Sequence, residues 1–190
     1  MPKVVDAATR RREIHSAACA LAVEAGFAGV TIRAVAARMG ASTSVVTHYF
    51  PSREELVSSA LDQALDRFWQ GLPTAPPPTG GPMGIQAFVE HAVFSSAPEL
   101  RDVWMRAVVD APGDPVVRAS LDRFDRRWDA TVSTLVDALA LDEAATRLLI
   151  DQLDIIVSGA VTTGVEGVPD ADRRAAVSSL LAHLLARGSG

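Results

Sequence analysis

The chain has 190 residues, 48% of them apolar, and a formal net charge of −5. That length and composition indicate a globular protein with one sizeable core, or a small domain joined to a larger one. The single cysteine, Cys19, excludes an intrachain disulfide and fits a reducing compartment. No stretch reaches the roughly 18 uninterrupted apolar residues that a membrane span needs, so we expect a cytoplasmic protein with no membrane partner.

The charge is distributed unevenly along the chain. Residues 1–53 carry seven Lys/Arg and three Asp/Glu, a net +4, whereas residues 54–190 carry eleven and twenty, a net −9. A basic N-terminal module can neutralise phosphates while an acidic remainder discourages non-specific adhesion to a duplex. The negative total is therefore compatible with binding to DNA through the N-terminal part.

The start of the sequence predicts an N-terminal arm without regular structure, followed by a helix. Residues 1–8 lack periodicity, and Lys3 with Arg10–Arg12 could contact phosphates or could simply be solvated. From about Thr9 the apolar residues recur at helical spacing, and Gly26 has the position and type of a residue that ends a helix.

Residues 31–50 predict two short helices that meet at a glycine. Thr31 and Ser42 are suitable residues to cap the two helices at their N-terminal ends. Gly40 can adopt the positive φ that a tight reversal between them requires. This pattern is that of a helix-turn-helix, and the alternative is an ordinary helical hairpin inside a helical core.

The second of these helices, called the recognition helix, has two different faces. Val46 and Phe50 lie four residues apart on the face expected to pack. Short hydroxyl and imidazole side chains let a helix backbone approach base edges in the major groove and still offer donors, acceptors and a methyl group. The side chains of this kind on the other face are Thr43, Ser44, Thr47 and His48.

Pro51 stops the recognition helix, and a new helix follows at once. Ser52 and Glu55 form the spacing of a capping box, and Arg53 beside them is a candidate phosphate contact or a solvated side chain. The wide apolar stripe of this fourth helix predicts contact with both parts of the chain. We therefore predict a DNA-binding domain at residues 1–51 and an effector-binding and dimerisation domain at residues 52–190.

The remaining sequence predicts one long loop and otherwise only helices. Residues 71–82 contain five prolines and three glycines, which exclude regular structure. Helical spacing follows at 85–93, 98–108, 115–139 and 148–165, and again after Pro169. The prediction is an all-α fold of about nine helices.

Residues 148–165 are apolar around nearly the whole helix, so the helix must be covered on two sides. A two-fold pair of chains could cover it through a four-helix interface, and the alternative is the central helix of a monomeric bundle. The residues predicted to form a homodimer interface are Leu153, Ile156, Gly159, Ala160, Leu181 and Leu184.

The N-terminal third resembles the TetR family of bacterial transcriptional regulators. The resemblance rests on the pattern Arg11-x-x-Ile14-x-x-Ala17-Ala18-x-x-Leu21-x-x-x-x-Gly26-Phe27-x-x-x-Thr31-x-x-x-Val35-Ala36-x-x-x-Gly40-x-Ser42 and on Tyr49-Phe50-Pro51-Ser52-Arg53-Glu54-Glu55-Leu56. It implies a three-helix DNA-binding domain and a second helical domain whose last two helices pair in a dimer. The positions that the family uses on DNA are Thr31, Arg33, Thr43, Ser44, Thr47, His48, Tyr49 and Arg53.

Two of these positions depart from the pattern of many relatives. Thr47 stands where they carry an aromatic residue, and Arg53 stands where they carry a lysine. Arginine can still hold a phosphate, whereas Thr47 alters the surface presented to the groove, so the operator sequence does not follow from the resemblance.

The resemblance also implies an effector site within the second domain. Aromatic residues at helical spacing are often core residues, and those here could be core or pocket. The candidates for ligand binding are Phe88, His91, Trp104, Phe124, Asp125 and Trp128.

The residues do not favour catalysis. The four histidines have no metal-ligand spacing, Cys19 lies in a core pattern, and no phosphate loop is present, so we expect no enzyme activity, cofactor or metal. We expect a homodimeric repressor released from a palindromic DNA operator by a small apolar or amphipathic ligand. The alternatives are a regulator without a small-molecule inducer, whose second domain serves dimerisation or protein partners, and a small helical enzyme.

Overall fold

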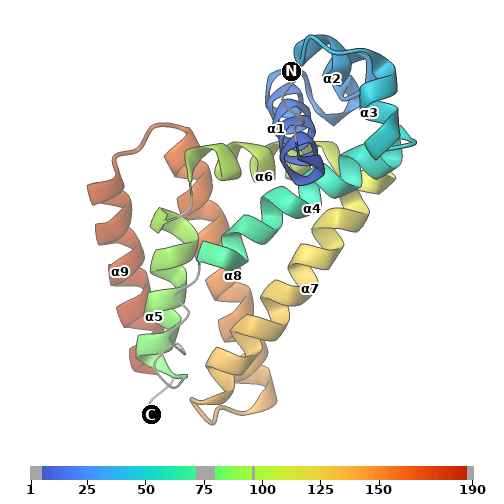
Figure 1. Ribbon diagram of the computed structural model, residues 1–190. Coiled ribbons are helices and arrows are strands. Elements are labelled where there is room, and N and C mark those ends of the chain that lie inside the picture. Colours follow the sequence, from blue (N-terminus) through green and yellow to red (C-terminus); the bar gives the residue numbers. More distant parts are fainter. Residues whose placement is uncertain (1–5, 72–79, 96, 188–190) are drawn as a thin grey trace. The chain divides into compact units, whose positions relative to one another are not determined.

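The computed structural model describes residues 6–71, 80–95 and 97–187, and within these ranges it contains helices and no strands (Figure 1). The predicted all-α fold is confirmed. Residues 1–5 of the predicted arm and 72–79 of the predicted loop lie outside the described ranges. The helices are α1 Ala7–Ala25, η1 Phe27–Gly29, α2 Ile32–Arg38, α3 Thr43–Tyr49, α4 Arg53–Gly71, α5 Pro82–Glu90, η2 His91–Ser95, α6 Pro98–Asp110, α7 Pro115–Asp137, α8 Glu143–Val165 and α9 Asp170–Arg187.

Several helices begin where the sequence places a capping side chain. The Thr31 hydroxyl accepts a hydrogen bond from the Ala34 N–H at 3.0 Å, and the Ser52 hydroxyl accepts one from the Glu55 N–H at 3.1 Å. Each bond satisfies an N–H that the first turn of a helix leaves without a partner. The predicted starts of α2 and α4 are thus explained by local chemistry.

Ser42 behaves differently from the prediction. Its backbone is extended and it directly precedes α3, as a cap residue should, but its side chain makes no capping bond. The Ser42 hydroxyl lies 2.7 Å from the hydroxyl of Ser44 instead. The start of α3 therefore depends on backbone geometry, and both hydroxyls belong to the exposed surface.

Two glycines are required by their backbone angles. Gly40 has a φ of +61° in the turn between α2 and α3, where a residue with a side chain would be strained. Gly26, at the end of α1, has a φ of +81°, and a Cβ there would lie 2.4 Å from Nη2 of Arg106. Both predicted helix ends are therefore confirmed.

The chain forms two compact units, each made of two segments. The first comprises residues 1–67 and 102–124, and the second comprises residues 68–101 and 125–190. The first unit thus joins α1–α3 to most of α4, to α6 from Asp102 on, and to the first part of α7. The predicted boundary after residue 51 concerns function, and it remains a prediction.

The core of the first unit is formed by small and branched apolar residues from all of its helices. In α1 and α4 the buried residues follow one helix face, and α2 packs against both α1 and α3. This packing fixes the two short helices, which could not be stable alone. The fully buried residues include Ile14, Phe27, Val30, Val35, Ala36, Val46, Phe50, Leu56, Val57, Leu61, Ala107 and Val117.

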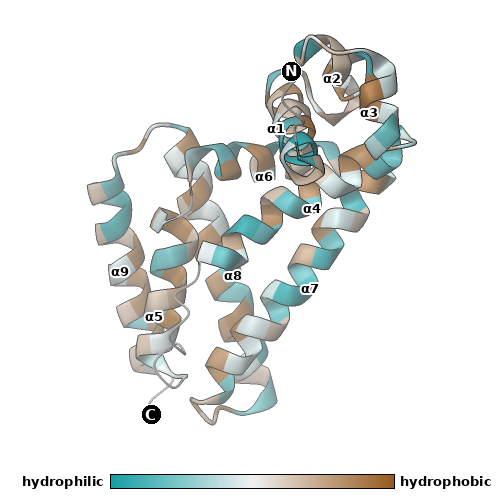
Figure 2. Cartoon of the chain, in the orientation of Figure 1, coloured by the Kyte–Doolittle hydropathy of each residue, from teal (hydrophilic) through white to brown (hydrophobic). Residues whose placement is uncertain are grey.

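The second unit contains α5, η2, α8 and α9 together with the last turn of α4 and most of α7. α8 packs against α9 and against η2, and α5 packs against α9. Figure 2 shows teal and brown segments following one another along α7, as expected of a helix with one buried face. The core residues include Phe68, Ile85, Phe88, Val89, Val93, Val132, Val136, Leu153, Val161, Val177 and Leu181.

One helix of the described ranges, α8, is long and apolar enough to cross a membrane by length and composition. Asp151 and Asp154 interrupt its apolar sequence, and the helix contacts α9 and η2 through its buried face. A core helix of a helical protein has a similar composition, but α9 and η2 cover only part of α8, and its large apolar side chains Leu148, Ile155 and Val165 are exposed.

A buried histidine links α1 to α4 in the first unit. Nδ1 of His15 lies 2.5 Å from Oε1 of Gln63, and Nε2 lies 3.0 Å from the Ser59 hydroxyl. Burial lowers the pKa of His15, the Gln63 bond raises it in part, and the charges of Arg11 and Arg67 lower it further. The neutral imidazole is therefore the form that the fold accommodates.

This histidine predicts a loss of stability in mild acid. As pH falls below 6.5, His15 of the unfolded chain takes up a proton before His15 of the folded chain does, so the free energy of unfolding decreases until pH reaches the lowered pKa. In denaturant titrations from about pH 8 to about pH 5, His15→Gln should flatten the pH dependence, by up to about 1.4 kcal/mol per pH unit. His183→Gln, which changes an exposed histidine of α9, is the control. An unchanged slope in His15→Gln would contradict the assignment.

Candidate nucleic-acid interface

The recognition helix α3 is held by its apolar face. Val46 of α3 and Val35 of α2 are both fully buried, and the two helices pack against each other. Because the turn at Gly40 fixes the angle between them, the opposite face of α3 points away from this packing. The geometry is that of a helix-turn-helix.

The side chains predicted to contact DNA lie at the surface. In α3, Thr43, Ser44, Thr47 and His48 are exposed, and Tyr49 is half-buried. Thr31 and Arg33, at the start of α2, are also exposed. The described structure therefore presents short polar side chains on a helix whose other face is buried, which is the arrangement that major-groove contact requires.

Arg11 adds a positive charge beside the recognition helix. Its guanidinium carbon lies 5.7 Å from the centre of the Tyr49 ring and 5.1 Å from that of Phe50. The rings favour a cation at this distance. The sequence suggested the arginine run 10–12 as a source of phosphate contacts, and the structure places Arg11 of that run against the end of α3.

Arg53 has partners within the first unit. Nη2 of Arg53 donates to the Phe27 carbonyl oxygen at 2.8 Å and to Oδ2 of Asp114 at 2.7 Å. The side chains of Arg53 and Asp114 are 27% and 14% exposed, so this ion pair is partly shielded from water. The role of Arg53 as a phosphate contact stays a prediction, and any phosphate must compete with these two acceptors.

Arg53 binds the backbone carbonyl oxygen of Phe27, and Asp110 binds its backbone N–H. Oδ2 of Asp110 accepts a hydrogen bond from the Phe27 N–H at 2.6 Å, and Arg106 pairs with Oδ1 of Asp110 at 2.7 Å. We call Arg53, Asp110 and Asp114 the Phe27 clasp. Phe27 is 2% exposed and is separated from α1 only by Gly26, so the clasp ties the end of α1 to the α6–α7 turn.

The clasp carboxylates favour their charged form. Burial raises the pKa of Asp110, but the Arg106 guanidinium and the Phe27 N–H outweigh burial and leave the pKa below its usual value. Burial likewise raises the pKa of Asp114, and Arg53 with the N–H groups at the start of α7 lowers it further than burial raises it. Each clasp bond is therefore a charge-assisted one at neutral pH.

The predicted effector residues divide between the two units. Within the second unit Phe88 and Trp128 are in contact, with ring centres 4.8 Å apart, and His91 lies 5.3 Å from Phe68 by the same measure. Nε2 of His91 lies 3.1 Å from the Phe68 carbonyl oxygen. Asp125 is exposed on α7 in the same unit, whereas Trp104 and Phe124 belong to the first unit.

Sequence reasoning missed a carboxylate at this aromatic cluster. The Trp128 indole N–H donates to Oδ1 of Asp154, which is half-buried on α8. Burial raises the pKa of Asp154, the indole N–H lowers it in part, and the charges of Asp129 and Asp151 raise it again. Only the packing of α7 near α8 reveals this pairing, because Asp154 alone resembles any polar residue of an amphipathic helix.

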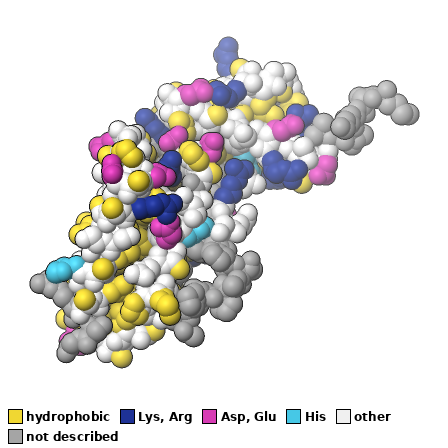
Figure 3. Space-filling view, turned by 90° about the vertical axis from the view of Figure 1, so that its left-hand side faces the viewer, with side chains coloured by type: hydrophobic (Ala, Val, Ile, Leu, Met, Phe, Trp, Pro, Cys, Tyr) yellow, Lys and Arg dark blue, Asp and Glu magenta, His cyan; other side chains and the backbone are white. Residues whose placement is uncertain are grey.

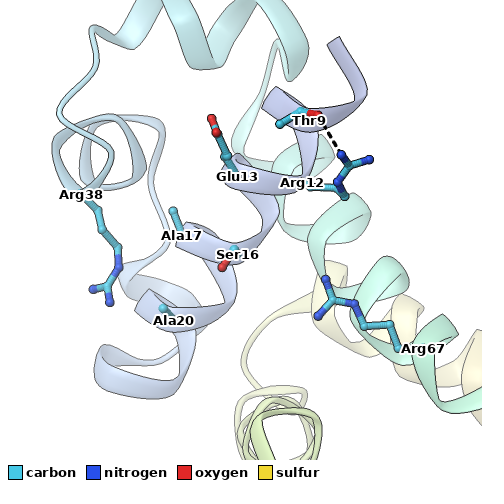
Figure 4. Close-up of a pocket in the computed structure, with 8 residues that line it drawn as sticks. All are labelled: Thr9, Arg12, Glu13, Ser16, Ala17, Ala20, Arg38 and Arg67. Carbon is cyan, nitrogen blue, oxygen red and sulfur yellow. Dashed lines mark hydrogen bonds between the residues drawn. The ribbon is translucent and has the colours of Figure 1, made fainter. Parts of the chain in front are cut away.

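A separate depression lies beside α1 and is bordered by Arg38 of α2 and Arg67 of α4 (Figure 4). It is open to solvent, with a volume of about 560 Å³, and its arginines are partly engaged, Arg12 with Thr9 and Arg38 with Glu24. Its lining residues are Thr9, Arg12, Glu13, Ser16, Ala17, Ala20, Arg38 and Arg67. An open polar surface of this kind differs from the enclosed, largely apolar site expected for an effector.

The predicted dimer residues are placed unequally. Leu153, Ala160 and Leu181 are 2%, 8% and 3% exposed, so they pack inside the second unit and have little surface left for a partner chain. Ile156 and Leu184 are half-buried, and Gly159 is exposed. The large apolar side chains that are exposed on α8 and α9 are Leu148, Ile155, Val165 and Leu180.

Known proteins resemble this chain in both sequence and fold. A family model described as "Bacterial regulatory proteins, tetR family" matches residues 14–60. The HTH-type transcriptional regulator BetI of Brucella anthropi is 27% identical over 151 residues, which are 78% of each chain.

Two solved structures share the fold over most of the chain. A transcriptional regulator from Rhodococcus sp. Rha1 has a TM-score of 0.75 and 18% identity, and the match covers 95% of this chain and 98% of that one. The multidrug binding protein EbrR, solved in complex with malachite green, has a TM-score of 0.66 and 20% identity, with 93% and 98% covered. The family match assigns the part of the chain that carries the helix-turn-helix to the TetR family of transcriptional regulators. The likeness to BetI extends over most of the chain in sequence, and the two solved structures extend it in fold.

Proposed function

We propose that the protein is a homodimeric repressor that occupies a palindromic operator and leaves it when a small ligand binds. The observation that carries the proposal is the exposed polar face of α3, on a helix whose opposite residue Val46 is fully buried. Such a face has no role in the core of the first unit, and its hydroxyl and imidazole groups match the donors and acceptors of the major groove.

The proposed contacts with DNA fall into two kinds. Side chains of α3 contact base edges, and residues at its borders and at the start of α2 contact phosphates. We also propose phosphate contacts for Arg53, because of its position, and for Arg11. A phosphate at Arg53 must compete with the bonds of the Phe27 clasp. The base contacts are Thr43, Ser44, Thr47 and His48, and the backbone contacts are Thr31, Arg33 and Tyr49.

We propose that the dimer forms through α8 and α9. Ile155 is 71% exposed and Leu148 and Leu180 are more than half exposed, so three large apolar side chains of α8 and α9 are open to a partner chain. Figure 3 shows yellow side chains gathered on the face of the molecule that carries α9. The interface therefore shifts from the predicted residues Leu153 and Leu181 to their exposed neighbours, and Gly159 stays in it.

A two-fold pair gives the repressor its operator geometry. A dimer of helix-turn-helix proteins binds half-sites about 34–36 Å apart, one turn of DNA, so the operator mirrors the protein's symmetry. A ligand that favours another arrangement of the two recognition helices weakens operator binding, by no more than its own preference for that arrangement, typically ~1–3 kcal/mol.

The proposed effector site is the aromatic cluster of the second unit. Phe88, His91 and Trp128 are predicted ligand residues that the structure brings together with Phe68. EbrR, which shares the fold, was solved with malachite green, so a protein of this architecture can hold an aromatic ligand. The relatives are named as transcriptional regulators, and we propose a cytoplasmic regulator without catalytic activity.

Selection from a random pool of duplexes tests this function. The full-length protein should enrich a near-palindrome whose half-sites are one helical turn apart. On the enriched duplex, His48→Ala should change the preference at particular base pairs by about 1–3 kcal/mol, whereas Arg33→Ala should weaken binding to all sequences and reduce the salt slope by about 1. A pool that stays random, or identical effects of both changes on every sequence, would contradict the proposal.

A further inference from the structure

We propose that Asp154 and the rings of Phe68, Phe88 and Trp128 form the binding point for a quaternary ammonium group, so the effector is a lipophilic organic cation. This inference rests on the proposed function, because it names the class of ligand for the same site. All four residues belong to the second unit.

The rings provide surfaces that attract cations. The ring centres of Phe88 and Trp128 are 4.8 Å apart, those of Phe68 and Trp128 6.0 Å, and those of Phe68 and Phe88 6.3 Å. Aromatic faces attract a cation through their quadrupoles but offer no hydrogen-bond acceptor. A quaternary ammonium needs no acceptor, whereas a primary ammonium must satisfy three donors, so the ring surfaces favour the former.

Asp154 provides a negative charge that lacks a cationic partner within the described ranges. It is half-buried and its partner there is the neutral indole N–H of Trp128. The nearby carboxylates Asp129 and Asp151 make its ionisation less favourable still, as the raised pKa of Asp154 reflects. A bound organic cation would stabilise the ionised carboxylate. Relief of this unfavourable charge would therefore contribute to the free energy of binding.

The charge of the whole unit acts in the same direction. The two segments of the second unit carry twelve Asp/Glu and seven Lys/Arg, a net −5, whereas the first unit carries eleven of each. The acidic excess of the chain is therefore confined to the unit that contains the proposed site, and it attracts cations and repels anions.

The indole of Trp128 occupies the position that the ammonium would take. The three rings touch one another, so an ammonium reaches Asp154 only if the Trp128 ring turns aside and becomes a wall of the site. Binding then exchanges a hydrogen bond from a neutral indole donor for an ion pair. This exchange predicts opposite effects for two substitutions: Trp128→Phe removes the competing N–H and keeps a ring, whereas Trp128→Ala removes both.

Calorimetric titration of the full-length protein with phenyltrimethylammonium tests the inference, with tert-butylbenzene as the uncharged isostere. The ammonium should bind and the isostere should not bind measurably. Trp128→Phe should equal or exceed the unchanged protein in affinity, and Trp128→Ala should lose ~2- to 30-fold. Affinity should also rise with pH through the pKa of Asp154, because the carboxylate form is the one that pairs.

The matched pair Asp154→Asn and Asp137→Asn separates the site from the general field. Both remove one negative charge, and Asp137 is exposed near the end of α7. Asp154→Asn should lose at least about 10-fold in affinity, the loss expected for an ion pair worth ~1.4 kcal/mol, and Asp137→Asn much less. Equal losses in both, no loss in either, or equal binding of the isostere would overturn the inference.

The same series separates this inference from the proposed function. If a neutral or anionic compound releases the operator while phenyltrimethylammonium does not bind, the cation inference fails and ligand-controlled repression stands. If phenyltrimethylammonium binds through Asp154 and operator binding is unchanged, the cation-binding site stands, and its role as the effector site of a ligand-controlled repressor fails.

Discussion

Ile155→Glu is expected to convert the protein from a dimer to a monomer. Ile155 is 71% exposed in the middle of α8, so the substitution leaves the core of the second unit intact. In a two-fold interface the change enters twice and places two carboxylates in an apolar contact. Because each monomer then holds one half-site alone, affinity for the full operator should fall by ~10²- to 10⁴-fold.

Sedimentation equilibrium and operator titration measure the two effects. Val109→Glu is the matched control, because Val109 is also an exposed branched apolar residue on a helix, 64% exposed on α6. It should leave both the dimer and the operator affinity unchanged. If Ile155→Glu remained a dimer, or if Val109→Glu dissociated equally, the interface would lie elsewhere.

Asp110→Ala is expected to destabilise the first unit and to weaken operator binding. It leaves the buried Phe27 N–H without its acceptor and Arg106 without its partner, which should lower the free energy of unfolding by about 1–3 kcal/mol. Asp110→Asn keeps an acceptor and should cost less. Since the folded pKa of Asp110 lies below 3.8, its stabilising effect is present above pH 3.8 and is lost as pH falls through the lowered value.

Denaturant titration at neutral pH is the measurement for this prediction. Asp122→Ala is the control, because Asp122 pairs with Arg118 at 3.8 Å and both side chains are about half exposed. Exposed pairs contribute at most about 1 kcal/mol, so this variant should change stability little. Equal effects of the two substitutions would show that the Phe27 clasp has no special role.

The sequence predicts best what is decided within a few residues. The Thr31 cap, the turn at Gly40 and the two faces of α3 all follow from side chains close to one another in the chain. The Phe27 clasp did not follow, because Phe27 and Asp110 are 83 positions apart. For the same reason the sequence indicates only that Arg53 lies beside the recognition helix, and not that it bonds to Phe27 and Asp114.

The contacts of a helix that is apolar on several sides are harder to predict from its sequence. Along α8 the composition indicates that two faces need covering, but it does not distinguish the face that α9 covers from the one left exposed. Leu153 was predicted at the dimer interface and lies in the core, whereas Ile155, two positions on, is exposed. Likewise Trp128 was a candidate ligand residue, and its partner Asp154 emerged only from the packed helices.

The central claim is that the exposed face of α3 binds DNA, and a charge placed on that face tests it most directly. His48→Glu should reduce affinity for the selected operator by at least about 100-fold, since a carboxylate there meets phosphates and base acceptors, while the free energy of unfolding stays within about 0.5 kcal/mol. Val109→Glu, which also adds a carboxylate at an exposed position but on α6, should leave operator affinity unchanged. Undiminished operator binding by His48→Glu would contradict the account.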